Sequence, residues 1–152
     1  MKRSVSCYLV FALMIGLVAT NSWALTEIQW WHAMAGPNGE KLAEIATNFN
    51  NSQSDFKVVP VRKGNYTETL TAGIAAFRSR KQPHILQVSA AGTQTVMVAA
   101  AKGAFKSVSE LMKETGEPFS QSTYLKSVIG FFVDPKNEML SLPFNCSTPT
   151  LS

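Results

Sequence analysis

Apolar and polar positions change their period near the start of the chain, and the change predicts a strand followed by a helix. Thr26–His32 is short and rich in β-branched and aromatic residues, which favours a strand. From Glu40 onward the apolar residues recur at helical spacing, in the order Leu42, Ile45, Ala46 and Phe49. Gly36-Pro-Asn-Gly39 between them is predicted to be a turn, with Pro37 as a plausible first helical residue.

The same alternation continues in the next forty residues. Phe56–Arg62 is a second predicted strand, and Pro60 inside it indicates an edge position or a strand end. A second helix is predicted to begin near Tyr66, with its threonines mostly outside and an apolar face formed by Tyr66, Leu70, Ile74 and Phe77. The short apolar run Ile85–Val88 is typical of a strand buried in the middle of a parallel sheet.

The remaining chain predicts three more helices and one more strand. Thr93–Ala101 is small and apolar, as in a well-buried helix, and Ser107–Thr115 opens with the spacing of a capping box. Ser120–Phe132 is predicted to be a helix, and Met139–Leu142 a strand. Such alternation predicts an α/β domain with a mixed, mostly parallel sheet and helices on both faces.

The first 24 residues are expected to be a cleaved signal peptide and are excluded from this fold. Lys2 and Arg3 precede the uncharged apolar run Cys7–Val18, and Ser22-x-Ala24 fits a signal-peptidase site. The apolar run is too short for a mature membrane helix, which needs roughly 20 residues. We therefore expect export to the periplasm and a mature chain of residues 25–152.

The mild charge argues against a nucleic-acid-binding protein, and the cysteine content argues against a domain held by an internal disulfide. Two of the 14 basic residues and none of the 10 acidic ones lie in the signal peptide, so the mature chain carries 12 against 10, or +2. So mild a charge, without a basic stripe, argues against nucleic acid as a partner. Cys146 is the one cysteine left after cleavage, so an internal disulfide is excluded and the core must hold the fold.

The sequence gives little support for an enzyme or for a metal site. His32 and His84 are the two histidines and do not sit in a ligand-spaced motif, so no metal is expected. Cys146 lies in a loop without a nucleophile elbow, which disfavours a small secreted hydrolase. No phosphate-loop fingerprint is present, and no cofactor is expected.

Several residues near the strand ends could line a binding site, although each has a structural explanation too. Trp30 and Trp31 must face opposite sides of a strand, so one belongs to the core and the other could line a pocket. Tyr66 at a helix start could pack or contact a ligand. The start of the first helix is a possible anion seat. Asn145-Cys-Ser-Thr148 offers hydroxyl and amide groups that could equally stabilise a turn.

Five short runs carry a family resemblance. In chain order they are Trp31-His32, Lys63-Gly-Asn-Tyr66, Ala72-Gly-Ile-Ala-Ala-Phe-Arg78, Ile85-Leu-Gln-Val88 and Pro143-Phe-Asn-Cys-Ser-Thr-Pro149. Through them the chain resembles type 1 extracellular solute-binding proteins of bacterial ABC importers, in the branch that binds sn-glycerol-3-phosphate. The resemblance covers essentially the whole mature chain.

The resemblance implies a type II periplasmic-binding-protein fold, a two-lobed α/β clamp that closes on its ligand and is not an enzyme. The implied partners are sn-glycerol-3-phosphate or a glycerophosphodiester, and the membrane permease subunits of the importer. The implied ligand contacts are Tyr66 and Ser147. The family has a glutamate where this chain has Ala90, so that carboxylate contact is expected to be lost, and Trp31 is a weaker candidate contact.

Members of the family are roughly three times longer and cross to the second lobe just after the Ser-Thr-Pro motif. Residues 25–152 are therefore expected to be a truncated, partial first lobe. A lobe that cannot close covers less of a ligand, so weak binding is expected. The alternative is a remnant of such a protein with no biochemical role. Without the rest of the lobe, apolar faces such as that of Val128 and Phe132 would stay uncovered and be an aggregation risk.

Overall fold

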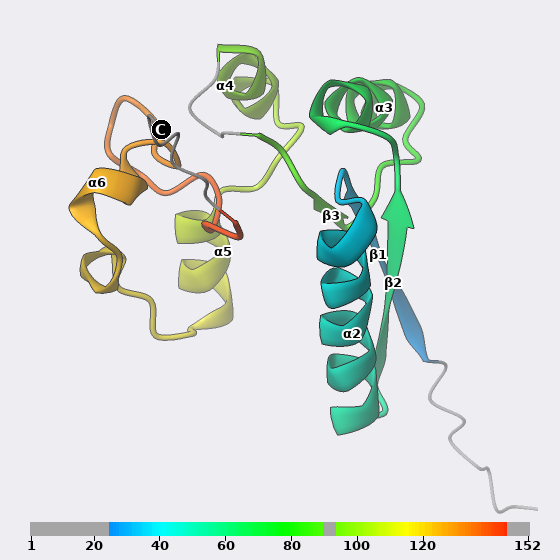
Figure 1. Ribbon diagram of the computed structural model, residues 1–152. Helices are drawn as coiled ribbons and strands as arrows, with labels where there is room; N and C mark the ends of the chain where they lie inside the picture. Colours follow the sequence, from blue (N-terminus) through cyan, green and yellow to red (C-terminus); the bar gives the residue numbers. More distant parts are fainter. Residues whose placement is uncertain (1–24, 90–93, 146–152) are drawn as a thin grey trace, which may run out of the picture.

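Three parallel strands and five α-helices form the part of the chain that the computed structural model describes, residues 25–89 and 94–145. The strands are β1 (Thr26–His32), β2 (Phe56–Arg62) and β3 (Ile85–Leu86), in the order β2-β1-β3. Figure 1 shows α2 and α3 beside this sheet, and α4, α5 and α6 grouped in the left half of the view. The predicted α/β class is confirmed, and the sheet built from the three strands is entirely parallel.

β1 is the central strand, where the sequence had suggested Ile85–Val88. It pairs with β2 along all seven residues, from Thr26 opposite Phe56 to His32 opposite Arg62. The predicted bounds of β1 and β2 are confirmed, and so is the edge position of Pro60. β3 keeps two paired residues and lies at the other edge of the described sheet. At the next position, the Gln87 side chain bonds to Ala33 and Asn145.

The first helix, α2, spans Gly36–Ser52 and starts earlier than the apolar stripe suggests. Gly36-Pro-Asn-Gly39 is its first turn and not a separate turn, with Pro37 at the position where a missing N–H costs nothing. Leu42 and Ala46 are buried as predicted, but Ile45 and Phe49 remain almost half exposed. The predicted stripe is thus covered on one side only.

The second helix, α3, spans Tyr66–Arg78 and packs through its smallest residues. Thr69, Gly73 and Ala76 are the buried positions, so the prediction that Thr69 lies outside is wrong. An added Cβ on Gly73 would come within 2.5 Å of Leu86 Cδ2, which shows how closely this helix approaches β3. Small residues allow that approach, whereas Leu70, Ile74 and Phe77 sit at its margins, half-buried.

α2 and α3 cover opposite faces of the sheet. Trp30 and Ile85 stand opposite one another in the register and line a groove with α2, whereas the next pair, Trp31 and Leu86, belongs to the α3 face. Side chains alternate along a strand, so these neighbouring pairs must point to different faces. A sheet flanked by helices on both faces is the layered arrangement that the sequence predicts.

The rest of the described chain is less regular than predicted. The helices are α4 (Gln94–Ala101), α5 (Val108–Thr115) and α6 (Lys126–Ile129), with a 3₁₀ turn, η1, at Gln121–Thr123. The predicted helix Ser120–Phe132 is therefore wrong, since it breaks into η1 and α6. Of α4, only Val96 is buried, so the prediction of a well-buried helix is also wrong.

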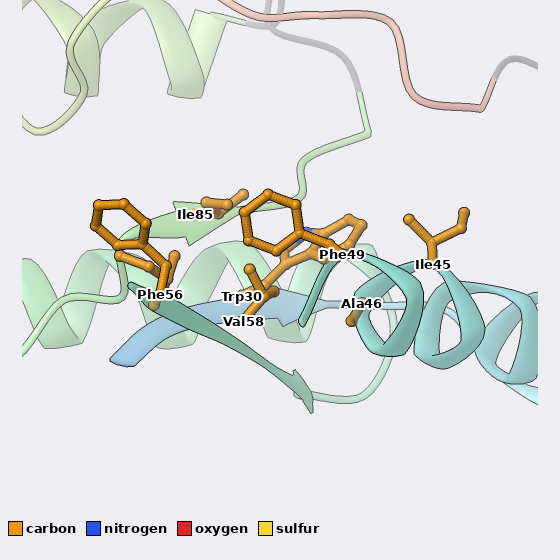
Figure 2. A pocket seen from close by; sticks show the side chains of 8 residues that line it. Trp30, Ile45, Ala46, Phe49, Phe56, Val58 and Ile85 are labelled. Carbon is orange, nitrogen blue, oxygen red and sulfur yellow. The ribbon is translucent and has the colours of Figure 1, made fainter. Parts of the chain in front are cut away.

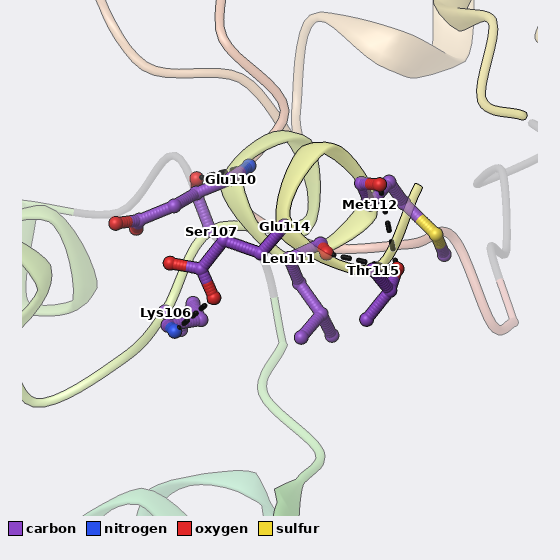
Figure 3. A network of polar contacts seen from close by, with 7 residues as sticks. All are labelled: Lys106, Ser107, Glu110, Leu111, Met112, Glu114 and Thr115. Carbon is purple, nitrogen blue, oxygen red and sulfur yellow. Dashed lines mark hydrogen bonds and ion pairs between the residues drawn. The ribbon is translucent and has the colours of Figure 1, made fainter. Parts of the chain in front are cut away.

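α5 has the predicted bounds, but only the Ser107 half of the predicted capping box is present. Ser107 is its N-cap and accepts a hydrogen bond from the Glu110 N–H at 3.1 Å, and Gly116 closes it in the left-handed conformation. Figure 3 shows the polar side chains around it, including the ion pair of Lys106 with Glu114 at 2.5 Å. The hydrogen bond to Glu114 is the main cause that raises the pKa of Lys106 above its ordinary value. Both partners are exposed, so the pair adds little stability.

Met139 and Phe132 form a small apolar centre near the end of the described chain. Met139 is fully buried and forms an isolated antiparallel bridge with Val133 in place of the predicted strand Met139–Leu142. Phe132 is only 7% exposed, so its predicted exposure is wrong. Asp134 holds the intervening turn by accepting from the N–H groups of Lys136 and Glu138.

The predicted signal peptide, residues 1–24, lies outside the described residues. Within the described ranges, no helix combines the length and apolar character needed to cross a bilayer.

Candidate functional site

The carboxyl ends of the three parallel strands meet at one edge of the sheet, and the chemistry-bearing side chains gather there. The Lys63 N–H donates to the His32 carbonyl, and the Gln87 N–H to the Trp31 carbonyl, both at 2.9 Å. These bonds hold the residues that follow β2 and β3 beside the end of β1. Ligands of open α/β sheets usually bind outside this edge.

Trp31 presents its indole ring to a cation. Lys63 Nζ lies 3.9 Å from the ring centroid, within the range of a cation–π contact. The indole Nε1–H donates to Gln29 Oε1 at 3.1 Å, which fixes the ring from the other side. The half-buried Trp31 is therefore held in one orientation next to a positive charge, and both groups could take part in binding an anionic ligand.

Tyr66 is the first residue of α3, and its place is set by a complete capping box. Asn65 Oδ1 accepts from the Glu68 N–H at 3.0 Å, and Glu68 Oε2 accepts from the Asn65 N–H at 2.7 Å. Gly64 precedes the cap with φ +94°, a conformation that favours glycine. The Lys63-Gly-Asn-Tyr66 run thus turns the chain sharply from β2 into α3 and leaves Tyr66 half-buried at the carboxyl edge.

A buried amide connects three segments at the same edge. Gln87 Oε1 accepts from the Ala33 N–H at 3.0 Å, and Gln87 Nε2 donates to Asn145 Oδ1 at 3.2 Å. Asn145 Nδ2 in turn donates to Met34 Sδ at 3.3 Å. The loop that ends at Asn145 is therefore tied to the ends of β1 and β3.

The two histidines lie in different environments. His32 is 6% exposed, and its pKa is lowered, mainly because burial disfavours the charged ring and further because Arg62 is near. His84 Nδ1 accepts a hydrogen bond from the Gln29 N–H at 3.0 Å. No group of three potential ligand side chains occurs in residues 25–89 and 94–145.

Trp30 faces the other side of the sheet, where an apolar groove runs between α2 and the strands. Figure 2 shows side chains from α2 and all three strands around it, and the cavity measures about 350 Å³. The lining side chains are all apolar: Ile28, Trp30, Ile45, Ala46, Phe49, Phe56, Val58 and Ile85. Phe144 packs edge-on against Trp30, with the ring centroids 5.2 Å apart.

Two of the predicted ligand contacts can be placed, and both lie at the carboxyl edge. They are Tyr66 and Trp31, on α3 and β1. Ser147, Ala90 and Cys146 lie outside the described residues. Sequence reasoning missed Gln87 and Lys63. The signal for Gln87 was available, since it is a polar residue inside the apolar run Ile85-Leu-Gln-Val88.

The chain is similar to several curated proteins that share a name. The sn-glycerol-3-phosphate-binding periplasmic protein UgpB of Agrobacterium fabrum is 48% identical over 134 residues, which cover 88% of this chain and 30% of that protein. The protein of the same name from Rhizobium meliloti is 50% identical over 128 residues, 84% of this chain and 29% of its own length. The chain is a relative of these binding proteins. The resemblance drawn from the sequence motifs is confirmed.

A protein of the same name from a third organism also matches this chain over only part of its own length. The Yersinia pestis protein of that name is 48% identical over 134 residues, again 88% of this chain and 30% of the relative. The chain thus spans about 30% of the length of the curated relatives it matches. No family model matches the chain.

Proposed function

We propose that this chain forms part of the periplasmic binding component of an ABC importer. In this proposal the carboxyl edge of its sheet contributes one wall of a site for sn-glycerol-3-phosphate. The observation that carries it is 47–50% identity to proteins named for binding that ligand, over most of this chain. The remnant without a biochemical role is not better supported. We infer binding without catalysis, because those relatives are named as binding proteins.

The chemistry of the edge fits a small phosphorylated polyol. An indole face, an ammonium group and a phenol lie along it, on Trp31, Lys63 and Tyr66. Such groups pair with the carbon face, the phosphate charge and the hydroxyls of glycerol phosphate. We propose Tyr66 and Ser147 as ligand contacts, and Trp31 as a wall of the site. The membrane permease subunits of the importer are the proposed protein partners.

A titration of the purified chain with sn-glycerol-3-phosphate, followed by NMR, tests the proposal. One wall covers only part of a ligand, so we expect an affinity weaker than micromolar, with shifts concentrated at Trp31 and the first turn of α3. Tyr66→Phe should weaken the response by roughly three- to tenfold, the effect of one hydrogen bond. Tyr124→Phe, far along the chain, is the matched control and should change nothing.

Glycerol and inorganic phosphate serve as ligand controls. A response to sn-glycerol-3-phosphate no greater than to either of them would overturn the proposal. Affinity in the micromolar range or tighter would instead refute the single-wall account.

Ala90 offers a gain-of-function test of the same site. We propose that it occupies the position of a ligand-binding glutamate in the family. Ala90→Glu should then strengthen binding by about 1.5–3 kcal/mol, the contribution of a charge-assisted hydrogen bond, measured in the same titration. Ala90→Gln separates charge from size and should gain less. Unchanged affinity in Ala90→Glu would remove this position from the site.

A further inference from the structure

We propose that Gln87 is the positioning residue of this edge: its carboxamide docks residues 143–145 onto the end of β1 and so holds this loop at the carboxyl edge. The link to ligand binding rests on the proposed function above, whereas the docking itself does not. Gln87 would act through the loop and would not touch the ligand.

Both ends of the Gln87 amide are committed, and the side chain is nearly inaccessible. It is 7% exposed, accepts from the Ala33 N–H and donates to Asn145 Oδ1. Its backbone N–H bonds to the Trp31 carbonyl at 2.9 Å. One residue therefore connects the end of β3, the segment after β1 and a loop 58 positions later in the chain.

The direction of each amide follows from its partners. A backbone N–H needs an acceptor, so Gln87 Oε1 must face Ala33, which leaves Nε2 to meet Asn145 Oδ1. Asn145 Nδ2 is then free to donate to Met34 Sδ at 3.3 Å. The chain of donors and acceptors is consistent from end to end, and reversing either amide would set like groups against each other.

An apolar residue at position 87 would suit the strand but not the loop. The neighbouring strand residues Ile85 and Leu86 are apolar, and leucine at 87 would fill similar space. It would, however, leave the Ala33 N–H without its acceptor and Asn145 without its donor. Phe144 contacts Trp30 as well, but a ring contact fixes distance and not the direction of the following backbone.

Amide hydrogen exchange of the full chain tests the docking without any ligand. Gln87→Leu should speed exchange at Ala33 by about tenfold or more, because the Ala33 N–H loses its acceptor. Asn50→Leu is the matched control, because the Asn50 amide also makes two bonds, to Val58 N–H and C=O, at the opposite end of the sheet. It should lower overall stability comparably and leave Ala33 protected.

Gln87→Glu supplies the conservative rescue. The carboxylate can still accept from the Ala33 N–H, so protection of Ala33 should be largely restored. If Gln87→Leu speeds exchange at Ala33 no more than Asn50→Leu does, Gln87 has only a general structural role and the inference is overturned.

Titration with sn-glycerol-3-phosphate is the second arm. We expect roughly three- to tenfold weaker binding in Gln87→Leu and unchanged binding in Asn50→Leu. Equal affinity in wild type and Gln87→Leu would overturn the link to binding and leave the proposed function standing. A wild-type chain that does not respond to the ligand would overturn the proposed function, while the exchange experiment still decides the docking role.

Discussion

Thr69 is a polar side chain in an apolar position. It is fully buried on the inner face of α3, and its hydroxyl has no hydrogen-bond partner among the residues that the structure describes. A buried hydroxyl without a partner destabilises the folded state relative to an apolar group of the same shape.

Replacing Thr69 by valine should therefore stabilise the chain. We expect the free energy of unfolding to rise by about 0.5–1 kcal/mol, as measured by urea denaturation, because valine keeps the shape and removes the unpaired hydroxyl. Thr67→Val on the exposed side of the same helix is the control and should change stability little. A loss of stability in Thr69→Val would show that the hydroxyl does have a partner in the folded chain.

The strands and helices show which features of the fold can be predicted from the sequence and which cannot. β1 and β2 were predicted to the residue, because each is a short β-branched and aromatic run bounded by turn residues. The inner face of α3 was not, since apolar spacing points to Tyr66, Leu70, Ile74 and Phe77, whereas close packing selects small residues. Only the approach of Leu86 makes Gly73 valuable, and that distance is tertiary information.

The contact of α3 with β3 gives a test at the scale of elements. Gly73→Ala should destabilise the wild-type chain by about 1 kcal/mol, because its Cβ meets Leu86 and forces the leucine to move. In a Leu86→Ala background the clash is gone, and the same change should stabilise by about 1 kcal/mol through helix propensity. The double-mutant cycle is read from urea unfolding. Equal effects in both backgrounds would contradict the close approach.

The positions of the candidate site residues in the fold were predicted in part for similar reasons. Tyr66 and Trp31 lie on a helix and a strand whose ends can be predicted from the sequence pattern. Because the carboxyl ends of parallel strands meet at one edge, both residues are expected at that edge. Gln87 and Asn145 are 58 residues apart, and nothing local announces that they meet. The helix predicted over Ser120–Phe132 failed because its apolar spacing is helical, yet the described chain buries Phe132 with Met139 in a loop-rich region.

At the scale of the whole molecule, one group of exposed apolar side chains lies together on the α2 face of the sheet. Ile45, Phe49, Phe56 and Ile85 are each 44–46% exposed around the groove, and Phe144 packs against Trp30 there. The predicted exposure of apolar residues is thus present, but at the sheet and not at Phe132.

The groove should bind an apolar dye in the folded chain. We expect 8-anilinonaphthalene-1-sulfonate fluorescence to rise with the purified protein below its unfolding transition, and Phe56→Ser to reduce the rise severalfold, since exposed apolar patches bind such probes. Leu125→Ser is the control: Leu125 is 73% exposed but stands away from the groove. An equal reduction in both variants would place the dye elsewhere.

The outer side of β2 closes the sheet to growth in one direction. The Lys63 N–H points to β1, and the direction of the N–H groups alternates along a strand. The backbone nitrogens of Val58, Pro60 and Arg62 therefore face away from β1. Asn50 occupies the first of these with its own side chain, and proline has no N–H to offer. An incoming strand would find a single free donor there, which protects this flank against edge-to-edge aggregation. Of the two edges of the described sheet, the β2 edge is therefore the less open to a further strand.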